Sequence, residues 1–333
     1  MKKIVALLLA AIILCAFVGC SSKEASVEEQ KEALANEETT EEDTSAEEPL
    51  TIAFCQIGNY NTWRIAETEW IEAACKERGY KLIYTDGQSD TAKQVSDVED
   101  VIAQKPDYIL LPPRETTGFE TVLSMAADAG IPVLLIDRNT EGEYVTQVSA
   151  DFVWEGEQCA VLLDDYFKGE EFNVVVIEGT PGADSGIKRY EGFKSYMEEH
   201  PNMKIIASQV GNFNRADAQE VMENLIQAYG NEIDAVFAHD DDSAIGAIQA
   251  LKAAGYKPGE DVVVVGVGGY ADALKAIKAG EMLGSVECSP YFDKAFEVID
   301  ILEAGGTVEK YIRNDGRIFT QENVTDELIA VAW

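Results

Sequence analysis

The fold is decided by the stretch VSADFVWEGEQCAVLLDDYFKGEEFNVVVIEG, residues 148–179. Its first letters end a strand-like apolar run, residues 154–169 predict an amphipathic helix, and NVVVIEG at 173–179 begins a new strand. The alternation of strands and helices therefore restarts in the middle of the chain. Two similar α/β lobes explain this restart more simply than one very large sheet does.

Apolar runs of strand length occur on both sides of this stretch. They are residues 51–57, 81–86, 108–112, 133–137 and 144–150, and then 173–179, 204–210, 235–240, 262–268 and 283–288. Amphipathic helical segments separate most of them. Continuous Val, Ile and Leu strands that alternate with helices indicate parallel sheets covered on both faces. Ligands of such sheets bind beyond the carboxyl ends of the strands, so two facing lobes would enclose one cleft.

The N-terminus predicts export. Residues 4–18 form an apolar run after two lysines, too short for a stable membrane span, which indicates a signal peptide over residues 1–19. The sequence FVGCSS at 17–22 resembles the lipobox of bacterial lipoproteins. That resemblance implies lipidation of Cys20 and an anchor on the outer face of the cell membrane. The alternative is an ordinary signal peptide in which this cysteine occurs by chance.

Acidic residues dominate the next segment and the whole chain. Residues 21–49 hold ten Glu and one Asp against two Lys, with almost nothing apolar to bury. We expect residues 20–49 to form a lipidated, disordered tether, although a helical acidic arm that binds a partner is an alternative. The full chain has 26 Lys and Arg against 61 Asp and Glu, a formal net charge of −35. Nucleic acid is not an expected partner, because phosphate binding needs clustered basic residues.

Polar and aromatic side chains follow most of the strand-like runs. The candidates for a ligand site are Trp63, Arg64, Asp137, Arg138, Asp151, Arg189, Phe213, Asp240 and Glu287. Asp and Arg make charge-assisted hydrogen bonds to hydroxyls, and an aromatic face covers the apolar side of a sugar ring. These residue types together predict a monosaccharide site. Taken singly, Trp63 and Phe213 could be core residues, and Asp137 with Arg138 could be a surface ion pair.

Residues 50 to about 325 resemble the sugar-binding proteins of ABC importers of the ribose and galactofuranose type. The matching segments are QIGNYNTWRIAET, LLPPRETTGFETVL, PVLLIDR, VSADF, IEGTPGADSGIKRYEGF, VGNFNRADAQEVMENLI, FAHDDDSAIGAIQALKAAG and GSVECSP. The resemblance implies a type I periplasmic binding protein fold, with two Rossmann-like lobes of parallel sheets joined by three crossovers. It also implies a monomer that closes on a monosaccharide and delivers it to an ABC permease, without catalysis or a cofactor.

The resemblance also implies how the chain divides and which residues bind. The N-terminal lobe would comprise residues 50–151 plus 289–316, and the C-terminal lobe residues 152–288 plus 317–333. The carried-over contacts are Trp63 and Arg64 in the first loop, Asp137 and Arg138 as the pair on ring hydroxyls, Arg189 and Phe213 from the opposite lobe, and Glu287 near the last crossing.

Two positions depart from the family's usual pattern. Asp240 stands where Asn is usual, and Gly268 stands where Asp is usual. We hypothesise that Asp240 takes over the missing hydroxyl contact, which a Gly268→Asp substitution would test. The alternative is a different or larger ligand that fills the space over Gly268. The sugar and its ring form stay open.

Three rival functions carry weaker signals. Gly266, Gly268 and Ala271 have the spacing of a dinucleotide-binding turn, with Glu287 21 residues after the first glycine, but the motif lies late in the chain. The run His239–Asp242 could suggest a metal, yet consecutive residues do not converge on one ion, and helix capping is the better interpretation. A sugar receptor for a signalling sensor has the same fold and stays an open alternative.

The cysteines beyond residue 20 show no metal-ligand spacing. Cys55 and Cys159 lie in apolar surroundings and are expected in the core, and the disulfide state of these two and of Cys75 and Cys288 is open.

Overall fold

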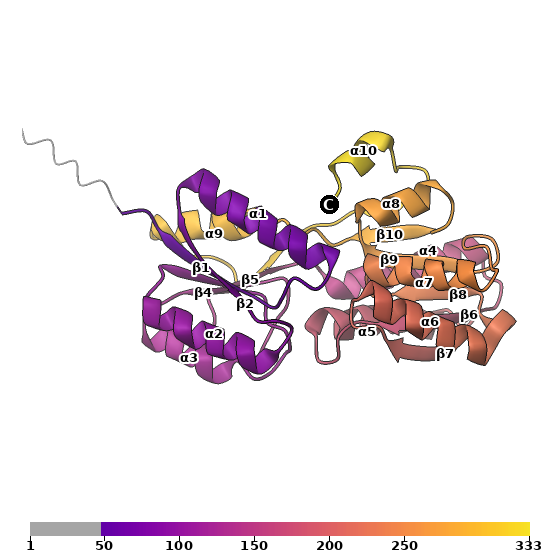
Figure 1. The fold of residues 1–333 in the computed structure, drawn as a ribbon, viewed down its shortest axis with the longest axis horizontal. Coiled ribbons are helices and arrows are strands. Elements are labelled where there is room, and N and C mark those ends of the chain that lie inside the picture. The colour runs from indigo at the N-terminus through magenta and orange to yellow at the C-terminus, as the bar shows by residue number, and fades with distance from the viewer. Residues whose placement is uncertain (1–47) are drawn as a thin grey trace, which may run out of the picture. The chain divides into compact units, whose positions relative to one another are not determined.

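The computed structural model describes residues 48–333, drawn in colour in Figure 1. The expected signal peptide, the lipidation site Cys20 and almost all of the expected tether lie outside these described residues. No helix within residues 48–333 has the length and apolar character needed to cross a membrane.

The first lobe is built on a six-stranded sheet with the order β11-β5-β4-β3-β1-β2, in which all neighbouring strands are parallel. Its strands are β1 (Thr51–Gln56), β2 (Lys81–Asp86), β3 (Tyr108–Leu111), β4 (Val133–Ile136), β5 (Thr146–Ser149) and β11 (Tyr311–Arg313). Its helices are α1 (Thr62–Arg78), α2 (Thr91–Gln104), α3 (Glu120–Asp128) and α9 (Asp293–Glu303).

Helices cover both faces of this sheet, as Figure 1 shows. Successive residues of β1 point to opposite faces. Ile52 and Phe54 belong to the core under α1 and α9, whereas Ala53 and Cys55 belong to the core under α2 and α3. The strands are therefore apolar without alternation, the pattern of a sheet buried on both sides.

The second lobe repeats this arrangement with the order β12-β10-β9-β8-β6-β7. Its strands are β6 (Phe172–Glu178), β7 (Met203–Val210), β8 (Ala235–Ala238), β9 (Val263–Gly268), β10 (Gly284–Glu287) and β12 (Ile318–Thr320). Its helices are α4 (Phe152–Phe167), α5 (Asp184–Glu199), α6 (Arg215–Tyr229) with the short η1 (Gly230–Glu232), α7 (Asp241–Ala253), α8 (Ala271–Lys278) and α10 (Asp326–Val331). Only β12 differs in direction, since it runs antiparallel to β10.

The two lobes are joined by three crossings of the chain. They lie between β5 and α4, between β10 and α9, and between β11 and β12. The expected two-lobed α/β fold is confirmed, and the expected strands all occur. The strands β11 and β12 are additional; each has three residues, too few to show a pattern in the sequence. The exact residues at which the lobes divide stay a prediction.

Helix α4 opens the second lobe and packs very closely on α5. A Cβ atom added at Gly156 would lie 1.9 Å from the carbonyl oxygen of Arg189, and one added at Gly192 would lie 1.9 Å from that of Val153. Only glycine fits at these two positions. This close approach brings Glu155 of α4 beside Arg189 of α5.

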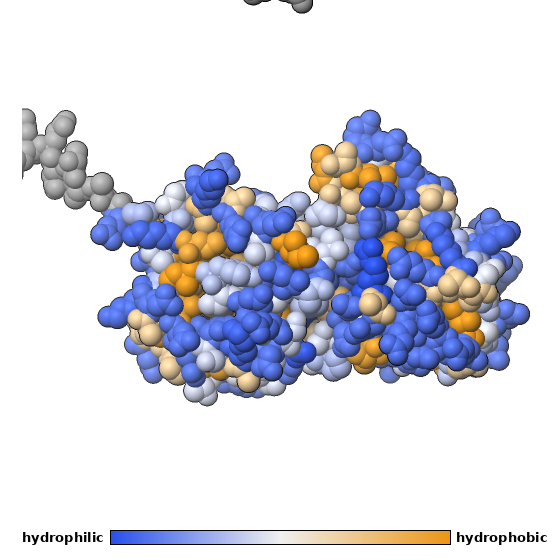
Figure 2. Space-filling model, viewed as in Figure 1, coloured by the Kyte–Doolittle hydropathy of each residue, from blue (hydrophilic) through white to orange (hydrophobic). Residues whose placement is uncertain are grey.

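The surface is hydrophilic, as the many charged residues of the sequence indicate, and the cysteines are buried. The face shown in Figure 2 is largely hydrophilic, with small scattered apolar areas. Cys55 and Cys159 are fully buried, as expected, and Cys55, Cys75, Cys159 and Cys288 are all free.

Candidate functional site

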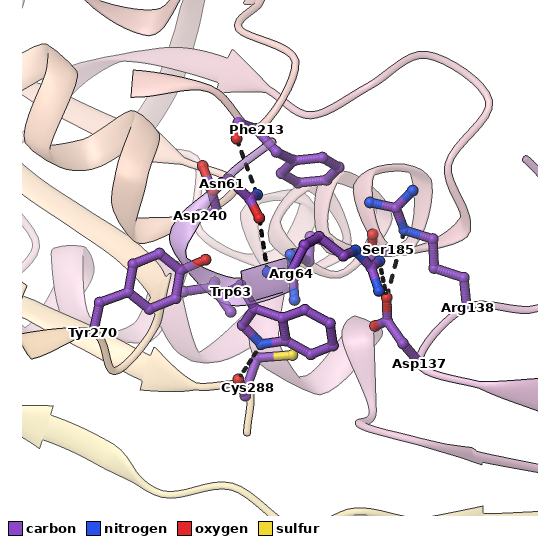
Figure 3. Close-up of a pocket in the computed structure, with 12 residues that line it drawn as sticks. Asn61, Trp63, Arg64, Asp137, Arg138, Ser185, Phe213, Asp240, Tyr270 and Cys288 are labelled. Atoms are coloured by element: carbon purple, nitrogen blue, oxygen red, sulfur yellow. Dashed lines mark hydrogen bonds and ion pairs between the residues drawn. The ribbon is translucent and has the colours of Figure 1, made fainter. Parts of the chain in front are cut away.

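A cavity lies between the lobes, at the carboxyl ends of strands from both sheets (Figure 3). It is lined by Asn61, Trp63, Arg64, Asp137, Arg138, Ser185, Arg189, Phe213, Asp240, Val267, Tyr270 and Cys288. Its volume is about 30 Å³ with the lobes in this arrangement. Small-molecule pockets span roughly 300–1,000 Å³, so the cavity lies well below this range and leaves no room for a dinucleotide.

Most of the candidate residues meet here, and two do not. Those in the wall are Trp63, Arg64, Asp137, Arg138, Arg189, Phe213 and Asp240. Asp151 instead accepts a hydrogen bond from the Trp154 N–H at 3.0 Å and faces Arg313 at 3.2 Å. Glu287 faces Arg317 at 3.1 Å. Because both arginines belong to the third crossing, these two carboxylates are engaged at the hinge and not in the cavity.

Other residues of the wall were outside the candidate set: Asn61, Ser185, Val267, Tyr270 and Cys288. Tyr270 and Cys288 follow β9 and β10 closely, so the rule that found the other candidates would have found them too. Ser185 lies four residues before Arg189 on α5 and therefore shares its helix face.

Arg64 is held in the first lobe by two carboxylates. Its side chain is 2 % exposed, donates to Glu67 Oε2 at 2.7 Å and forms a very short bond to Asp137. Glu67 also accepts from Gln56 Nε2 at 2.9 Å. Burial opposes the charge on Arg64, but the two carboxylates outweigh it and raise the pKa of the guanidinium. Arg64 therefore stays charged in the cavity wall.

Trp63 belongs both to the cavity wall and to the core. Its indole N–H donates to the carbonyl oxygen of Cys288 at 2.6 Å, and its ring meets Phe292 edge-on at 6.1 Å. The Arg64 guanidinium carbon lies 4.5 Å from the ring centroid. The two interpretations of Trp63 from the sequence thus apply together: the side chain fills core space beside the second crossing and also lines the cavity.

Asp137 and Arg138 are buried, which rules out a surface ion pair. Asp137 has φ +60°, a left-handed conformation that is unusual for a residue other than glycine. Arg138 donates to the Arg114 carbonyl oxygen at 3.1 Å and to the Tyr60 hydroxyl at 3.3 Å, and its guanidinium carbon lies 5.2 Å from the Phe213 ring centroid. Its Nε has no hydrogen-bond partner within residues 48–333.

Arg189 is the counterpart of Arg64 in the second lobe. It donates to Glu155 Oε2 at 2.8 Å and to the His239 carbonyl oxygen at 2.9 Å. Burial raises the pKa of Glu155 to about 7, against the opposing effect of Arg189. Burial, and then Arg189, lower the pKa of His239 to about 3, so its imidazole is neutral. The imidazole accepts from the Gly179 N–H at 3.2 Å, a structural role.

The carboxylates of Asp240, Asp241 and Asp242 serve separate purposes. Asp240 caps α7 through the Ser243 N–H at 3.0 Å, Asp241 accepts from the Gly269 N–H at 2.6 Å, and Asp242 pairs with Arg215 at 2.7 Å. Within residues 48–333 no group of His, Cys, Asp or Glu side chains is arranged to hold a metal ion. Burial and the neighbouring Asp242 raise the pKa of Asp240 to about 7.

The second oxygen of Asp240, Oδ2, is buried and has no hydrogen-bond partner in the described part of the chain. Since Asp240 lines the cavity, this oxygen is available to a ligand donor. A buried acceptor without a partner costs about 1–3 kcal/mol, which a ligand hydroxyl would recover.

The space over Gly268 is occupied by protein. A Cβ atom added at Gly268 would lie 2.3 Å from the ring of Tyr270. The glycine-rich turn is thus covered by an aromatic ring and is not open to a pyrophosphate. The same contact means that Gly268→Asp would displace Tyr270, so this substitution does not isolate the role of Asp240.

Hydrogen bonds join the lobes around the cavity. Asn61 Nδ2 donates to the Phe213 carbonyl oxygen at 3.1 Å, and the Thr62 N–H donates to Asp242 at 3.0 Å. On another side, the Asn139 N–H donates to Asp184 at 3.2 Å. The structure therefore shows the lobes closed on each other.

Known proteins share this fold and much of this sequence. The family described as periplasmic binding protein domain matches residues 52–302. A galactofuranose-binding protein of Escherichia coli is 39% identical over 288 residues, which cover 84% of this chain and 91% of that protein. A Shewanella arabinose transporter component, solved with L-arabinofuranose, has 37% identity and a TM-score of 0.81, covering 84% of this chain and 94% of that one. A Mycobacterium smegmatis protein in complex with β-D-fucofuranose has 35% identity and a TM-score of 0.79. The match covers 83% of this chain and 92% of that one.

Proposed function

Because the chain belongs to the periplasmic binding protein family, we propose that it captures a monosaccharide between its lobes and delivers it to an ABC importer. It is a solute-binding protein of the extracytoplasmic type, and its relatives are sugar-binding proteins of importers and not enzymes.

The observation that carries the proposal is the set of polar groups that the closed cavity leaves available. Asp240 Oδ2 is an acceptor and Arg138 Nε is a donor, and neither makes a hydrogen bond within residues 48–333, although Arg138 Nε lies 3.6 Å from Asp137 Oδ2. A hydroxyl group both donates and accepts, so a neutral polyol satisfies donors and acceptors around one small cavity. Hydrogen bonds to charged groups contribute about 1.5–3 kcal/mol each, which makes micromolar binding reachable after association costs.

We assign the binding roles as follows. Arg64, Asp137 and Arg138 contact hydroxyls from the first lobe, and Arg189 and Asp240 contact them from the second. The faces of Trp63 and Phe213 cover the apolar C–H side of the sugar.

Some relatives support a proposal for the ring form of the ligand. Three of the proteins with which the chain aligns carry galactofuranose, arabinofuranose and fucofuranose in their names or structures, and each of these three is at least 35% identical to it. We therefore assign a five-membered sugar ring to the ligand of this chain.

We further propose a lipid anchor on Cys20 after removal of residues 1–19, with the acidic segment up to residue 49 as the tether, and a monomeric protein. FVGCSS at 17–22 and the composition of residues 21–49 support this arrangement. Mass spectrometry of the membrane fraction tests it: a diacylglycerol-modified Cys20 is expected, and an unmodified cysteine would refute the anchor.

The function is tested by thermal unfolding of residues 48–333 with galactose, arabinose, ribose, xylose and NAD. A ligand that binds only the folded state raises the unfolding midpoint. At least one sugar should raise it and NAD should not; a shift with NAD alone would refute the proposal.

Asp240→Asn then tests the role of Asp240. Asn retains the helix cap but weakens the acceptor, so sugar affinity should fall about tenfold or more. Asp90→Asn is the matched control, because Asp90 caps α2 in the same way. Equal affinity for both variants would remove Asp240 from the site.

A further inference from the structure

We propose that Tyr270 closes one end of the cavity and makes the protein prefer a five-carbon furanose to a six-carbon furanose. This inference rests on the proposed function and specifies its substrate class.

The ring of Tyr270 occupies space that a longer ligand would need. Tyr270 follows β9 and is 2 % exposed, and it lines the cavity. Its ring lies directly over Gly268, where an added Cβ would come within 2.3 Å of Cε1 and 2.7 Å of Cδ1. Gly268 has φ +151° and no side chain, and the missing Cβ leaves the space that the Tyr270 ring occupies.

Two contacts fix Tyr270 in this position. Asp241 accepts from the backbone N–H groups of Gly269 at 2.6 Å and Tyr270 at 3.1 Å, and it also accepts from the Ser285 hydroxyl. Behind the ring lies Trp333, with the centroids 6.3 Å apart, and the Trp333 carbonyl oxygen accepts from the Ala271 N–H at 2.8 Å. The turn and the indole together prevent the tyrosine from moving back to admit a larger ligand.

The two ends of the cavity differ in chemistry. In Figure 3, Tyr270 lies across the cavity from Asp137 and Arg138, and its hydroxyl points inward. Charged groups at the Asp137 end suit the ring hydroxyls. The Tyr270 end has Val267 and Cys288 in its wall together with the Asp240 carboxylate, so it offers apolar surface beside one acceptor and suits a short exocyclic group that ends in a hydroxyl. The Tyr270 hydroxyl makes no hydrogen bond within residues 48–333, so it is free to contact the terminal hydroxyl of a short exocyclic CH₂OH.

Three sugars make a graded test. L-Arabinose, D-fucose and D-galactose share the configuration of C2, C3 and C4. As furanoses they differ only in the group on C4, which is CH₂OH, CH(OH)CH₃ or CH(OH)CH₂OH. Calorimetric titration of the wild type should give arabinose at least about tenfold tighter than galactose, with fucose between them.

Variants of Tyr270 separate its volume from its hydroxyl. Tyr270→Ala opens the end of the cavity, so the arabinose preference should fall to about threefold or less, or reverse. Tyr270→Phe keeps the volume, so the preference should stay while affinity for arabinose falls about three- to tenfold. Tyr291→Phe is the control, because Tyr291 also contacts Trp333 but is not among the residues that line the cavity. Its affinities should match the wild type within about twofold.

The outcomes are distinguishable. Galactose binding to the wild type as tightly as arabinose overturns the inference and leaves the proposed function intact. The inference is also overturned, and the proposed function again stays intact, if Tyr270→Ala keeps the wild-type preference for arabinose. A cooperative thermal unfolding transition would show that this variant is folded. If Tyr270→Ala does not fold, Tyr270→Phe still tests the inference. A changed preference between arabinose and galactose in Tyr270→Phe would show that the volume of the ring does not determine it. If the wild type binds no sugar at all, both the proposed function and the inference fall.

Discussion

The first lobe contributes Arg64 and Arg138 to the cavity wall and the second lobe contributes Arg189, and all three are buried. Arg64 and Arg189, which each pair with a glutamate, are held in different ways. Arg64 pairs with Glu67 three residues later on the same helix and with Asp137 beyond β4. Arg189 pairs with Glu155, which lies 34 residues away on another helix, and otherwise only with a main-chain carbonyl. Arg64 thus lies between two anions, whereas Arg189 pairs with one.

The difference concerns charge balance. Removal of Arg64 would leave two neighbouring buried carboxylates, whereas removal of Arg189 would leave Glu155, whose pKa burial already raises to about 7. A carboxyl that can take up a proton near neutral pH relieves its own burial. Burial also raises the pKa of Glu67, against the opposing effect of Arg64, but the first lobe has two carboxylates around its arginine where the second has one. We therefore expect the first lobe's site to be the less tolerant of substitution, and the second lobe's site to respond to pH near 7 through Glu155.

Substitution of each arginine by methionine should show the largest effect. Loss of one partner of a buried ion pair costs about 3–5 kcal/mol. At pH 8, we expect Arg64→Met to lower the free energy of unfolding by an amount in the upper part of this range. Arg189→Met should lower it by an amount in the lower part. The loss in Arg189→Met should shrink at pH 6, because Glu155 becomes protonated. Urea unfolding at both pH values measures this; equal losses that do not change with pH would contradict the comparison.

The next largest loss of stability is expected from substitution of a glycine at the contact between α4 and α5. Gly192→Ala places a Cβ 1.9 Å from the Val153 carbonyl oxygen, so the helices must separate, at a cost of about 1–3 kcal/mol. Because α4 carries Glu155 and α5 carries Arg189, sugar affinity should fall as well. Gly186→Ala on the same helix is the control, since its added Cβ would find its nearest neighbour at 3.6 Å. Its stability should be unchanged or slightly higher; equal losses in both variants would rule out the packing explanation.

Protonation of two carboxyl groups in the second lobe, Glu155 and Asp240, should change the free energy of unfolding by less than these substitutions do. The folded-state pKa values of Glu155 and Asp240 are raised to about 7, so their contribution to stability is lost as the pH rises through 7. The free energy of unfolding should therefore increase by about 1 kcal/mol per group between pH 8.5 and 6.5. His239, with a pKa lowered to about 3, opposes this only below pH 6.5, where the unfolded chain binds its proton.

Glu155→Gln should flatten this pH dependence in part. Thermal midpoints between pH 8.5 and 6.5 provide the measurement. A wild type whose stability falls over this range on acidification would show that other groups dominate.

The smallest effect is expected at Trp63. Trp63→Phe retains an aromatic ring but loses the N–H bond to Cys288, which should cost about 1 kcal/mol. Trp70→Phe is the control, because the Trp70 ring packs on Phe296 and its indole N–H makes no hydrogen bond within residues 48–333. A larger loss for Trp70 would show that packing, and not the bond to the second crossing, determines the cost.

Local patterns in the sequence predicted the two lobes and most of the cavity wall. Strand ends can be located from apolar runs, and residues such as Asp137 and Asp240 follow them directly. Partners distant in the sequence could not be predicted: Glu155 and Arg189 meet only because two glycines let their helices touch. The position of the Tyr270 ring over Gly268 could not be predicted from the sequence either, because it depends on a side-chain conformation. The family pattern pointed to Glu287, but an arginine of the third crossing engages it instead.

The repeated strand order also bears on the order of folding. Helix α9 and strand β11 complete the first sheet, yet they follow nearly the whole second lobe along the chain. During synthesis the first sheet therefore lacks its last strand until the second lobe has emerged. Pairing β11 with β5 closes a very long loop, which makes this a late and slow step. The second sheet likewise waits for β12, so both lobes are completed only by the last segment of the chain.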